Sequence, residues 1–130
     1  MILLDTHVIF WLAFEPNKIS RVAAEAIRGL QKSETYPAIS CISLYEISRM
    51  SERGRIELDE PLETFLSRLN SLFEVRPIRT EIAIAAARFP NNFPGDPADR
   101  IIAATAMVEG LSLVTADRHI RRSRVVKTIW

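Results

Sequence analysis

The sequence predicts one α/β domain, residues 1–130, in which helices cover both faces of a parallel sheet. Short β-branched or apolar runs alternate with segments of helical period from one end of the chain to the other. Right-handed crossovers between parallel strands place the intervening helices on the two faces of a sheet. A chain of 130 residues, 48% of them hydrophobic, can bury one core without disulfides.

Five short apolar or β-branched runs are the predicted strands. They lie at residues 2–4, 38–42, 73–78, 111–115 and 125–130. Helical segments separate the first four runs, which favours parallel pairing because parallel strands need a long crossover connection.

The helices of the first half are placed by their expected ends. Residues 8–14 form a short apolar helix, and Ser20 is the candidate N-cap of a helix that runs to about residue 30. After the second strand, Ser43 is the candidate N-cap of the next helix, which Gly54 ends as a C-cap.

The helices of the second half begin at proline or at a small polar residue. Pro61 fits the first turn of a helix with apolar residues on one face. Thr80 is the candidate cap of an alanine-rich helix over residues 81–89. A loop of breaker residues follows, and Asp96 with Pro97 then opens a further apolar helix.

Composition narrows the function classes. No signal peptide and no apolar run of membrane-spanning length is visible, so we expect a soluble, cytoplasmic protein that binds no membrane. The net charge of +1 does not by itself indicate a nucleic-acid binder, although arginine, which suits phosphate, supplies most of the positive charge. A basic run over residues 118–124 is either a solvated face or a phosphate contact. The two histidines and the single cysteine are too scattered for a zinc site.

Acidic residues collect where parallel strands should end. Asp5 follows the first strand directly, and Asp117 lies just past the fourth. Glu46 lies in the first turn of the helix after the second strand, and Asp96 and Asp99 open the helix before the fourth. Ligands of open parallel sheets bind at the carboxyl ends of the strands, so we predict that these carboxylates form one cluster.

Such a cluster indicates a divalent metal ion. Adjacent carboxylates cannot all stay ionised unless a cation neutralises them. A ligand set made only of oxygen atoms favours Mg²⁺ or Mn²⁺. One or two such ions would lower the pKa of a bound water and stabilise the charge that develops on a phosphodiester during in-line attack.

Most of these acids also have a purely structural interpretation. Side chains of this kind cap helices and turns or complement a helix dipole, as could Glu46, Asp96, Asp99 and Asp117. Asp5 has the weakest structural explanation, because an acid at an internal strand end is costly without a partner. The acids are therefore stronger evidence together than singly.

Four segments, in order along essentially the whole chain, carry a more specific pattern. They are Leu3-Leu4-Asp5-Thr6-His7-Val8, Ser43-Leu44-Tyr45-Glu46-Ile47, Gly95-Asp96-Pro97-Ala98-Asp99-Arg100 and Leu113-Val114-Thr115-Ala116-Asp117. The third is the most specific. Together they resemble the four motifs of the PIN-domain family, and within it those of the VapC-type toxins of toxin–antitoxin pairs.

This resemblance implies a three-layer α/β/α PIN-like domain with a five-stranded parallel sheet and a Mg²⁺- or Mn²⁺-dependent endoribonuclease. It also implies a homodimer and a cognate antitoxin protein that keeps the enzyme inactive. The family's catalytic metal ligands carry over to Asp5, Glu46, Asp99 and Asp117. Asp96 would be a secondary acid, Thr115 a hydroxyl that orients a carboxylate, and Arg100 and Arg118 contacts to the RNA backbone.

The chain departs from the family pattern at three positions. Tyr45 stands where tryptophan is frequent, Met50 where lysine is frequent, and Pro94 where histidine often precedes Gly-Asp-Pro. None is a predicted metal ligand, so these departures bear on substrate positioning and not on the reaction class.

Other functions stay open at the level of sequence. A PIN-like module could bind RNA or a protein without cutting, although all four acids are present. A haloacid-dehalogenase-like phosphatase also begins with an aspartate after its first strand, but it needs a second aspartate where this chain has His7. A nucleotide-binding module is a third alternative. The four glycines are isolated in the sequence, so they form neither the Gly-rich loop that binds dinucleotides nor the P-loop that binds nucleotide phosphates.

Overall fold

The computed structural model describes residues 1–130, and all of its strands pair in one parallel sheet. The strands are β1 (Ile2–Leu4), β2 (Ala38–Ser40), β3 (Glu74–Arg76), β4 (Ser112–Val114) and β5 (Thr128–Ile129). Their order is β3-β2-β1-β4-β5, so the first strand of the chain is the central one. The predicted five-stranded parallel sheet is confirmed, and each observed strand lies within its predicted run.

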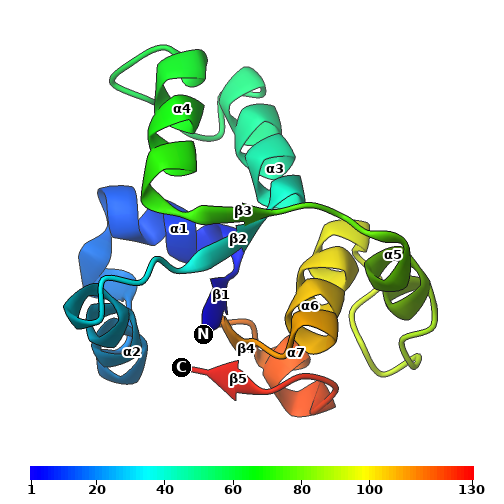
Figure 1. Cartoon of the computed structure of the whole chain (residues 1–130). Helices are drawn as coiled ribbons and strands as arrows, with labels where there is room; N and C mark the ends of the chain where they lie inside the picture. The colour runs from blue at the N-terminus through cyan, green and yellow to red at the C-terminus, as the bar shows by residue number, and fades with distance from the viewer.

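Helices cover both faces of this sheet (Figure 1). They are α1 (Thr6–Phe14), the 3₁₀ helix η1 (Pro16–Lys18), α2 (Arg21–Lys32), α3 (Cys41–Glu52), α4 (Leu62–Leu72), α5 (Thr80–Ala87), α6 (Pro97–Glu109) and α7 (Arg118–Ser123). Figure 1 shows α5, α6 and α7 together on one side, and α1 and α2 on the other. The three-layer α/β/α prediction is confirmed. None of the helices combines the length and apolar character that a membrane crossing needs.

Two hydrophobic clusters, one on each face, hold the layers together. Successive residues of a strand point to opposite faces, and the central strand follows this rule. Leu3 packs in the cluster with α5 and α6, whereas Ile2 and Leu4 pack in the cluster with α1 to α4. Leu3 and Leu4 are fully buried. The residue that follows β1 is therefore held at a fixed point at the carboxyl edge of the sheet.

The start of α3 differs from the prediction. Strand β2 ends at Ser40, whose hydroxyl caps the helix by accepting a hydrogen bond from the Ile42 amide at 3.3 Å. The predicted cap, Ser43, lies inside the helix and is fully buried. The sequence predicts Cys41 and Ile42 as part of the strand, because an apolar run alone does not distinguish a buried strand from a buried helix turn, but both residues lie in α3. Glu46 consequently lies in the second turn of α3, and not in the first.

Three other helix starts also differ, and the first is that of α1, which begins at Thr6 and not at residue 8. The predicted cap Thr80 is the first residue of α5, which begins without a side-chain cap at Arg79. Helix α7 was not predicted, because a run of arginines with one apolar residue has no clear helical periodicity. Its Asp117 accepts hydrogen bonds from two helix amides, and its Ile120 is fully buried. The predicted cap of α6, Asp96, is confirmed.

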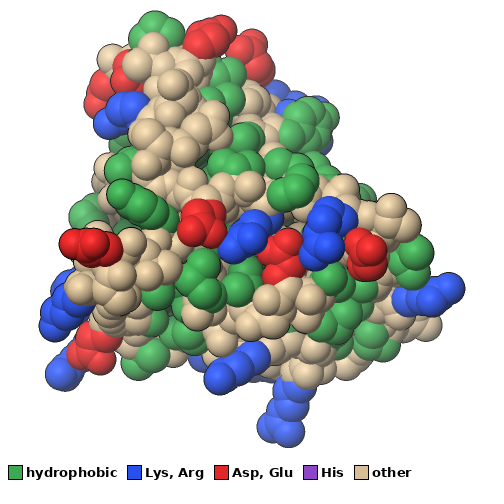
Figure 2. All heavy atoms as spheres, viewed as in Figure 1, with side chains coloured by type: hydrophobic (Ala, Val, Ile, Leu, Met, Phe, Trp, Pro, Cys, Tyr) green, Lys and Arg blue, Asp and Glu red, His purple; other side chains and the backbone are tan.

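A network of ion pairs joins β3 to α5 and α6. Arg76 pairs with Glu74 at 2.8 Å and with Glu109 at 3.4 Å. Arg79 pairs with the other oxygen of Glu109 at 3.4 Å and with Glu81 at 3.7 Å. Figure 2 shows acidic and basic side chains alternating across the face that carries β3 and α5.

Arg100 is committed to the loop between α5 and α6. Its guanidinium donates to four backbone carbonyls, at distances of 2.9 to 3.4 Å, which belong to Pro94, Ala86, Phe89 and Phe93. The planar fork of arginine supplies several donors in a fixed geometry, which suits this use. The arrangement argues against the RNA contact that the sequence suggested for Arg100, because its donors are already engaged.

We predict that Arg100→Lys lowers the free energy of unfolding by about 1–3 kcal/mol, because an ammonium group cannot reach all four carbonyls. Urea titration followed by circular dichroism measures the effect. Arg88→Lys, at an exposed arginine of the same region, is the matched control and should be neutral. Equal stability of the two variants would contradict the structural role of Arg100.

Candidate functional site

Asp5 is a buried carboxylate whose two oxygens are both engaged. It follows β1 and is 3% exposed, and its amide donates to the Val114 carbonyl of β4 at 3.0 Å. One oxygen, Oδ1, accepts a hydrogen bond from the Thr6 amide at 2.8 Å and so caps α1. The other, Oδ2, accepts from the Thr115 hydroxyl at 2.7 Å. Thr115 thus holds the Asp5 carboxylate from the neighbouring strand end, as a hydroxyl that orients a carboxylate would.

His7 closes the same corner of the site. Its Nε2 accepts a hydrogen bond from the Ala116 amide at 3.1 Å, and its Nδ1 lies 3.5 Å from Asp5 Oδ2. An accepting Nε2 requires the neutral ring with its proton on Nδ1, which faces the carboxylate. His7 therefore joins the segment after β4 to the start of α1 and serves to position Asp5.

Glu46 is held by a chain of hydroxyl groups. Thr6 Oγ1 lies 2.5 Å from Glu46 Oε1 and 2.9 Å from Ser43 Oγ. A hydroxyl has one proton to donate, and the carboxylate is the stronger acceptor, so Thr6 donates to Glu46 and accepts from Ser43. Thr6 and Ser43 are both buried. This chain ties α3 to the residue next to Asp5.

The other three acids lie at helix N-termini. Asp96 Oδ1 accepts from the amides of Ala98 and Asp99, at 2.8 and 3.2 Å. Asp117 Oδ1 accepts from two amides of α7, at 2.8 and 3.0 Å. The structural interpretation of Asp96 and Asp117 is thus correct, since both cap helices. The Oδ2 oxygen of each carboxylate accepts no hydrogen bond from the protein. Asp99 stands in the first turn of α6.

The five carboxylates are close enough to act on one another. Burial, followed by the charges of Asp5, Asp96, Glu46 and Asp117, raises the pKa of Asp99 from 3.8 to about 7. Burial also raises the pKa of Glu46, with smaller contributions from the charges of Asp5 and Asp96, against the bond from Thr6 and the charge of Arg49, which lower it. The structure therefore brings together all five acids that the sequence placed at this edge.

The residues present fit a divalent cation by charge and donor type. Every candidate donor is a carboxylate oxygen, which a hard ion such as Mg²⁺ or Mn²⁺ prefers. No three of the side chains are already arranged as a coordination shell. The crowded negative charge is the property that a cation would relieve.

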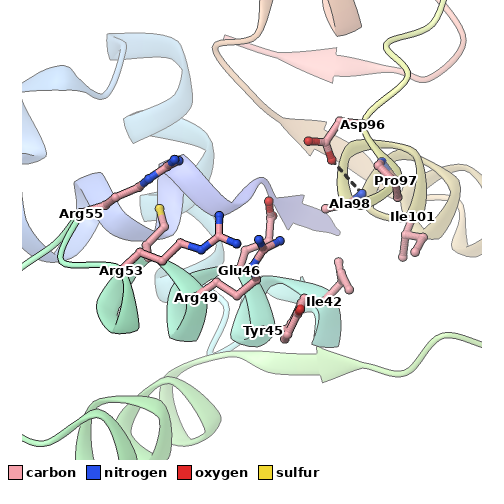
Figure 3. Close-up of a pocket in the computed structure, with 11 residues that line it drawn as sticks. Ile42, Tyr45, Glu46, Arg49, Arg53, Arg55, Asp96, Pro97, Ala98 and Ile101 are labelled. Atoms are coloured by element: carbon pink, nitrogen blue, oxygen red, sulfur yellow. Dashed lines mark hydrogen bonds between the residues drawn. The ribbon is translucent and has the colours of Figure 1, made fainter.

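A cleft of about 450 Å³ opens beside the acids, between α3 and the start of α6. Figure 3 shows Glu46 on α3 and Asp96 at the start of α6 on opposite walls. Three arginines, Arg49, Arg53 and Arg55, also line the cleft. The sequence interpretation missed these arginines. The available signal was the spacing of Arg49 and Arg53, which lie one and two turns beyond Glu46 on the same helix face.

Two of the three departures from the family pattern line this cleft. Tyr45 is 58% exposed and lies 5.8 Å from the Arg49 guanidinium, and Met50 is half-buried. Both therefore face the space beside the acids. Arg118, by contrast, is exposed at the start of α7, directly after Asp117.

Comparison with known proteins gives the site a family context. The profile of the PIN domain family matches residues 2–125. Ribonuclease VapC22 of Mycobacterium tuberculosis is 37% identical over 131 residues, covering 99% of this chain and 98% of the relative. VapBC2 of Rickettsia felis, solved with a promoter DNA fragment, superposes with a TM-score of 0.73 at 19% identity, covering 98% of this chain and 97% of that one. DNA-bound VapBC of Salmonella typhimurium superposes with a TM-score of 0.70 at 23% identity, covering 98% and 97%.

The raised pKa of Asp99 leads to a prediction about stability and pH. The folded state holds this proton more tightly than the unfolded state, so stability should fall as pH rises from about 4 to 7. Asp99→Asn removes the penalty, and at pH 8 the metal-free variant should melt about 3–6 °C above the parent for each kcal/mol relieved. The difference should vanish near pH 4. Thermal denaturation of the EDTA-treated proteins at both pH values measures it.

Asp59→Asn is the matched control for this prediction. It makes the same chemical change at an exposed loop aspartate. If Asp59→Asn and Asp99→Asn shift the melting temperature equally, or if Asp99→Asn destabilises the protein at pH 8, the burial and crowding of the Asp99 charge do not destabilise the fold.

Proposed function

The chain belongs to the PIN-domain family, and from this premise we propose that it is a metal-dependent endoribonuclease, the toxin of a type II toxin–antitoxin pair. The observation that carries the proposal is the crowding of five carboxylates at the carboxyl edge of the sheet, beside a cleft lined by three arginines. Acids supply ligands for a cation, and arginines supply forks for phosphate. A phosphodiester is the substrate that needs both.

Asp5, Glu46, Asp99 and Asp117 are the proposed metal ligands and catalytic acids, and Asp96 is a secondary acid. The ion is Mg²⁺ or Mn²⁺. When bound, such an ion makes water a stronger nucleophile and neutralises charge on the phosphodiester. The pKa values of Asp99 and Glu46 are raised, so these are the two acids whose negative charge the surrounding protein compensates least after burial.

The remaining residues of the site position these acids and the RNA. Thr115, after β4, and His7, on α1, position Asp5, and Thr6, also on α1, positions Glu46. Arg49 and Arg53 stand on the wall of the cleft and would contact backbone phosphates, which sets the register of the strand without reading its sequence. Arg118 is a further candidate contact.

The comparisons support the partners in this proposal. A relative that shares 37% of its residues over almost the whole length is a ribonuclease, which favours RNA as the substrate. Proteins of the same fold were solved as VapBC toxin–antitoxin complexes, which favours a cognate antitoxin as the inhibitor. We also propose that the chain forms a homodimer and acts in the cytoplasm, the compartment that holds RNA.

Cleavage of RNA tests the proposal directly. The purified chain, freed of any antitoxin, should cut a total-RNA sample into discrete fragments with Mg²⁺ or Mn²⁺ and should stop when EDTA is added. Asp5→Asn and Asp99→Asn should each lower the rate about a hundredfold or more, whereas Asp59→Asn should not. Gel electrophoresis of the RNA gives the readout.

The rival function, binding RNA or a protein without cutting, predicts a different result. A folded parent chain that cuts no RNA with either metal but still binds RNA or a partner would support that rival. Cleavage that survives in Asp5→Asn and Asp99→Asn would place the catalytic residues elsewhere.

Metal binding should depend on pH with a defined sign. A cation must displace the proton that Asp99 holds with a pKa of about 7. Each pH unit below 7 should therefore weaken Mn²⁺ binding by up to about tenfold for one displaced proton. Calorimetric titration between pH 5.5 and 8 measures the slope. Asp99→Asn should flatten it, and an equally steep slope in that variant would assign the proton to another group.

A further inference from the structure

Four arginines line an open hollow on the surface near the end of the chain, and no other residue type lines it. They are Arg118, Arg121, Arg122 and Arg124, and the hollow they form, which we name the arginine hollow, has a volume of about 400 Å³. All four side chains are exposed. The hollow is separate from the cleft between α3 and α6, with which it shares no lining residue.

Helix α7 and the turn that ends it bring these four side chains together. Arg118, Arg121 and Arg122 stand three and four residues apart on α7 and so share one helix face. Ile120 points the other way into the core, where it is fully buried, and fixes the rotation of the helix. Arg124 ends the helix in the left-handed conformation, at φ 56°, which side chains other than glycine rarely adopt. This turn keeps Arg124 on the rim of the arginine hollow.

The positive charge of the arginine hollow has no partner in the chain. Other arginines pair with carboxylates, as Arg76 and Arg79 do with Glu109. No ion pair in the structure includes an arginine of the hollow. Four guanidinium groups around one space repel one another, so the hollow favours an anion with several oxygens. Phosphate, which accepts two parallel bonds from each fork, is such an anion.

We propose that the arginine hollow binds the phosphate backbone of the RNA substrate on the side of the cleavage site opposite the α3 arginines. This inference rests on the proposed ribonuclease function. The hollow begins at the residue after Asp117, whose carboxylate belongs to the acid cluster. Arg49 and Arg53 follow β2, the arginine hollow follows β4, and the acids surround the end of β1 between them. Figure 1 shows α3 and α7 on opposite sides of the central strand.

This placement predicts a dependence on RNA length. A strand that spans only the acids and the α3 cleft does not reach the arginine hollow, whereas a longer strand contacts both basic groups. Backbone contacts outside the reacting phosphodiester add binding in the ground state and the transition state alike. Their loss should therefore raise KM for long RNA and leave kcat unchanged.

The test compares two double variants on two substrates. Arg121→Gln with Arg122→Gln removes two charges from the arginine hollow, and Arg28→Gln with Arg88→Gln removes two exposed charges elsewhere. The substrates are single-stranded RNAs of about four and about sixteen nucleotides around one cleavable bond, lengths that bracket common single-strand sites. The hollow variant should raise KM for the long RNA on the order of tenfold and flatten the dependence of log KM on log salt by about 1.4, from two phosphate contacts. Its KM for the short RNA, its kcat and both values for the control should stay within about twofold.

Several outcomes would overturn the inference. The two double variants could raise KM for the long RNA equally, or the hollow variant could raise KM for the short and the long RNA by the same factor. The hollow variant could also keep its RNA kinetics and lose binding of the antitoxin, which would assign the surface to an acidic protein segment. Lysine at both positions keeps the charge and should restore most of the affinity, which separates lost charge from a damaged fold.

Failure of the proposed function is distinguishable from failure of this inference. If the unmodified chain cuts no RNA with either metal, the ribonuclease assignment fails. The arginine hollow is then tested by anisotropy of a labelled RNA of about sixteen nucleotides on the uncut background. Equal affinity of the parent and the hollow variant in that assay overturns the inference.

Discussion

The structure depends on the burial of one charged group, the Asp5 carboxylate, at the end of the central strand. A buried carboxylate is tolerated only when its oxygens find donors. Here two donors are the first amide of α1 and the Thr115 hydroxyl after β4, and the His7 ring lies beside the same carboxylate, with its Nδ1 3.5 Å from Oδ2. The hydrogen bonds to Asp5 fix the direction in which α1 starts after β1, and they fix the position of the end of β4 beside β1. The burial of Asp5 in the proposed active site and the packing of the sheet centre are thus the same constraint.

Negative charge around this point is shared unequally among the acids. Helix amides at the starts of α6 and α7 stabilise Asp96 and Asp117, as partial positive charge at a helix N-terminus should. The Asp99 carboxylate, in the first turn of α6, accepts no hydrogen bond and has a raised pKa, and Glu46 accepts one, from the Thr6 hydroxyl. The fold therefore tolerates an electrostatic cost at two residues. Sites that are destabilising in the folded protein and useful in the reaction are a recurrent feature of enzymes.

Much of this fold and of its site could be predicted from sequence because hydrophobic runs, caps and strand ends are local signals. Asp5, Asp117 and the Asp96 cap were placed by their neighbours in the chain, and the PIN-like motifs added the strand arrangement. The failures were cases that local patterns cannot decide. Cys41 and Ile42, the apolar pair after Ser40, belong to helix α3 because of their tertiary packing. The basic run after Asp117 forms helix α7 because its Ile120 packs in the hydrophobic core. Arg100 and Arg49 look alike in sequence, and only tertiary contacts commit one to carbonyls and leave the other in the cleft.

The ion pairs along β3 limit how copies of this protein can associate. β3 is an edge strand, and an edge strand with free backbone groups is a template on which another chain can add a strand. Here Glu74 and Arg76 lie on the strand itself, where they pair with each other, and Arg76 also pairs with Glu109 of α6. An incoming strand would have to break that network and desolvate its charges. The sheet is therefore protected against growth at the β3 edge, and the addition of a strand from another copy is disfavoured on this side of the molecule.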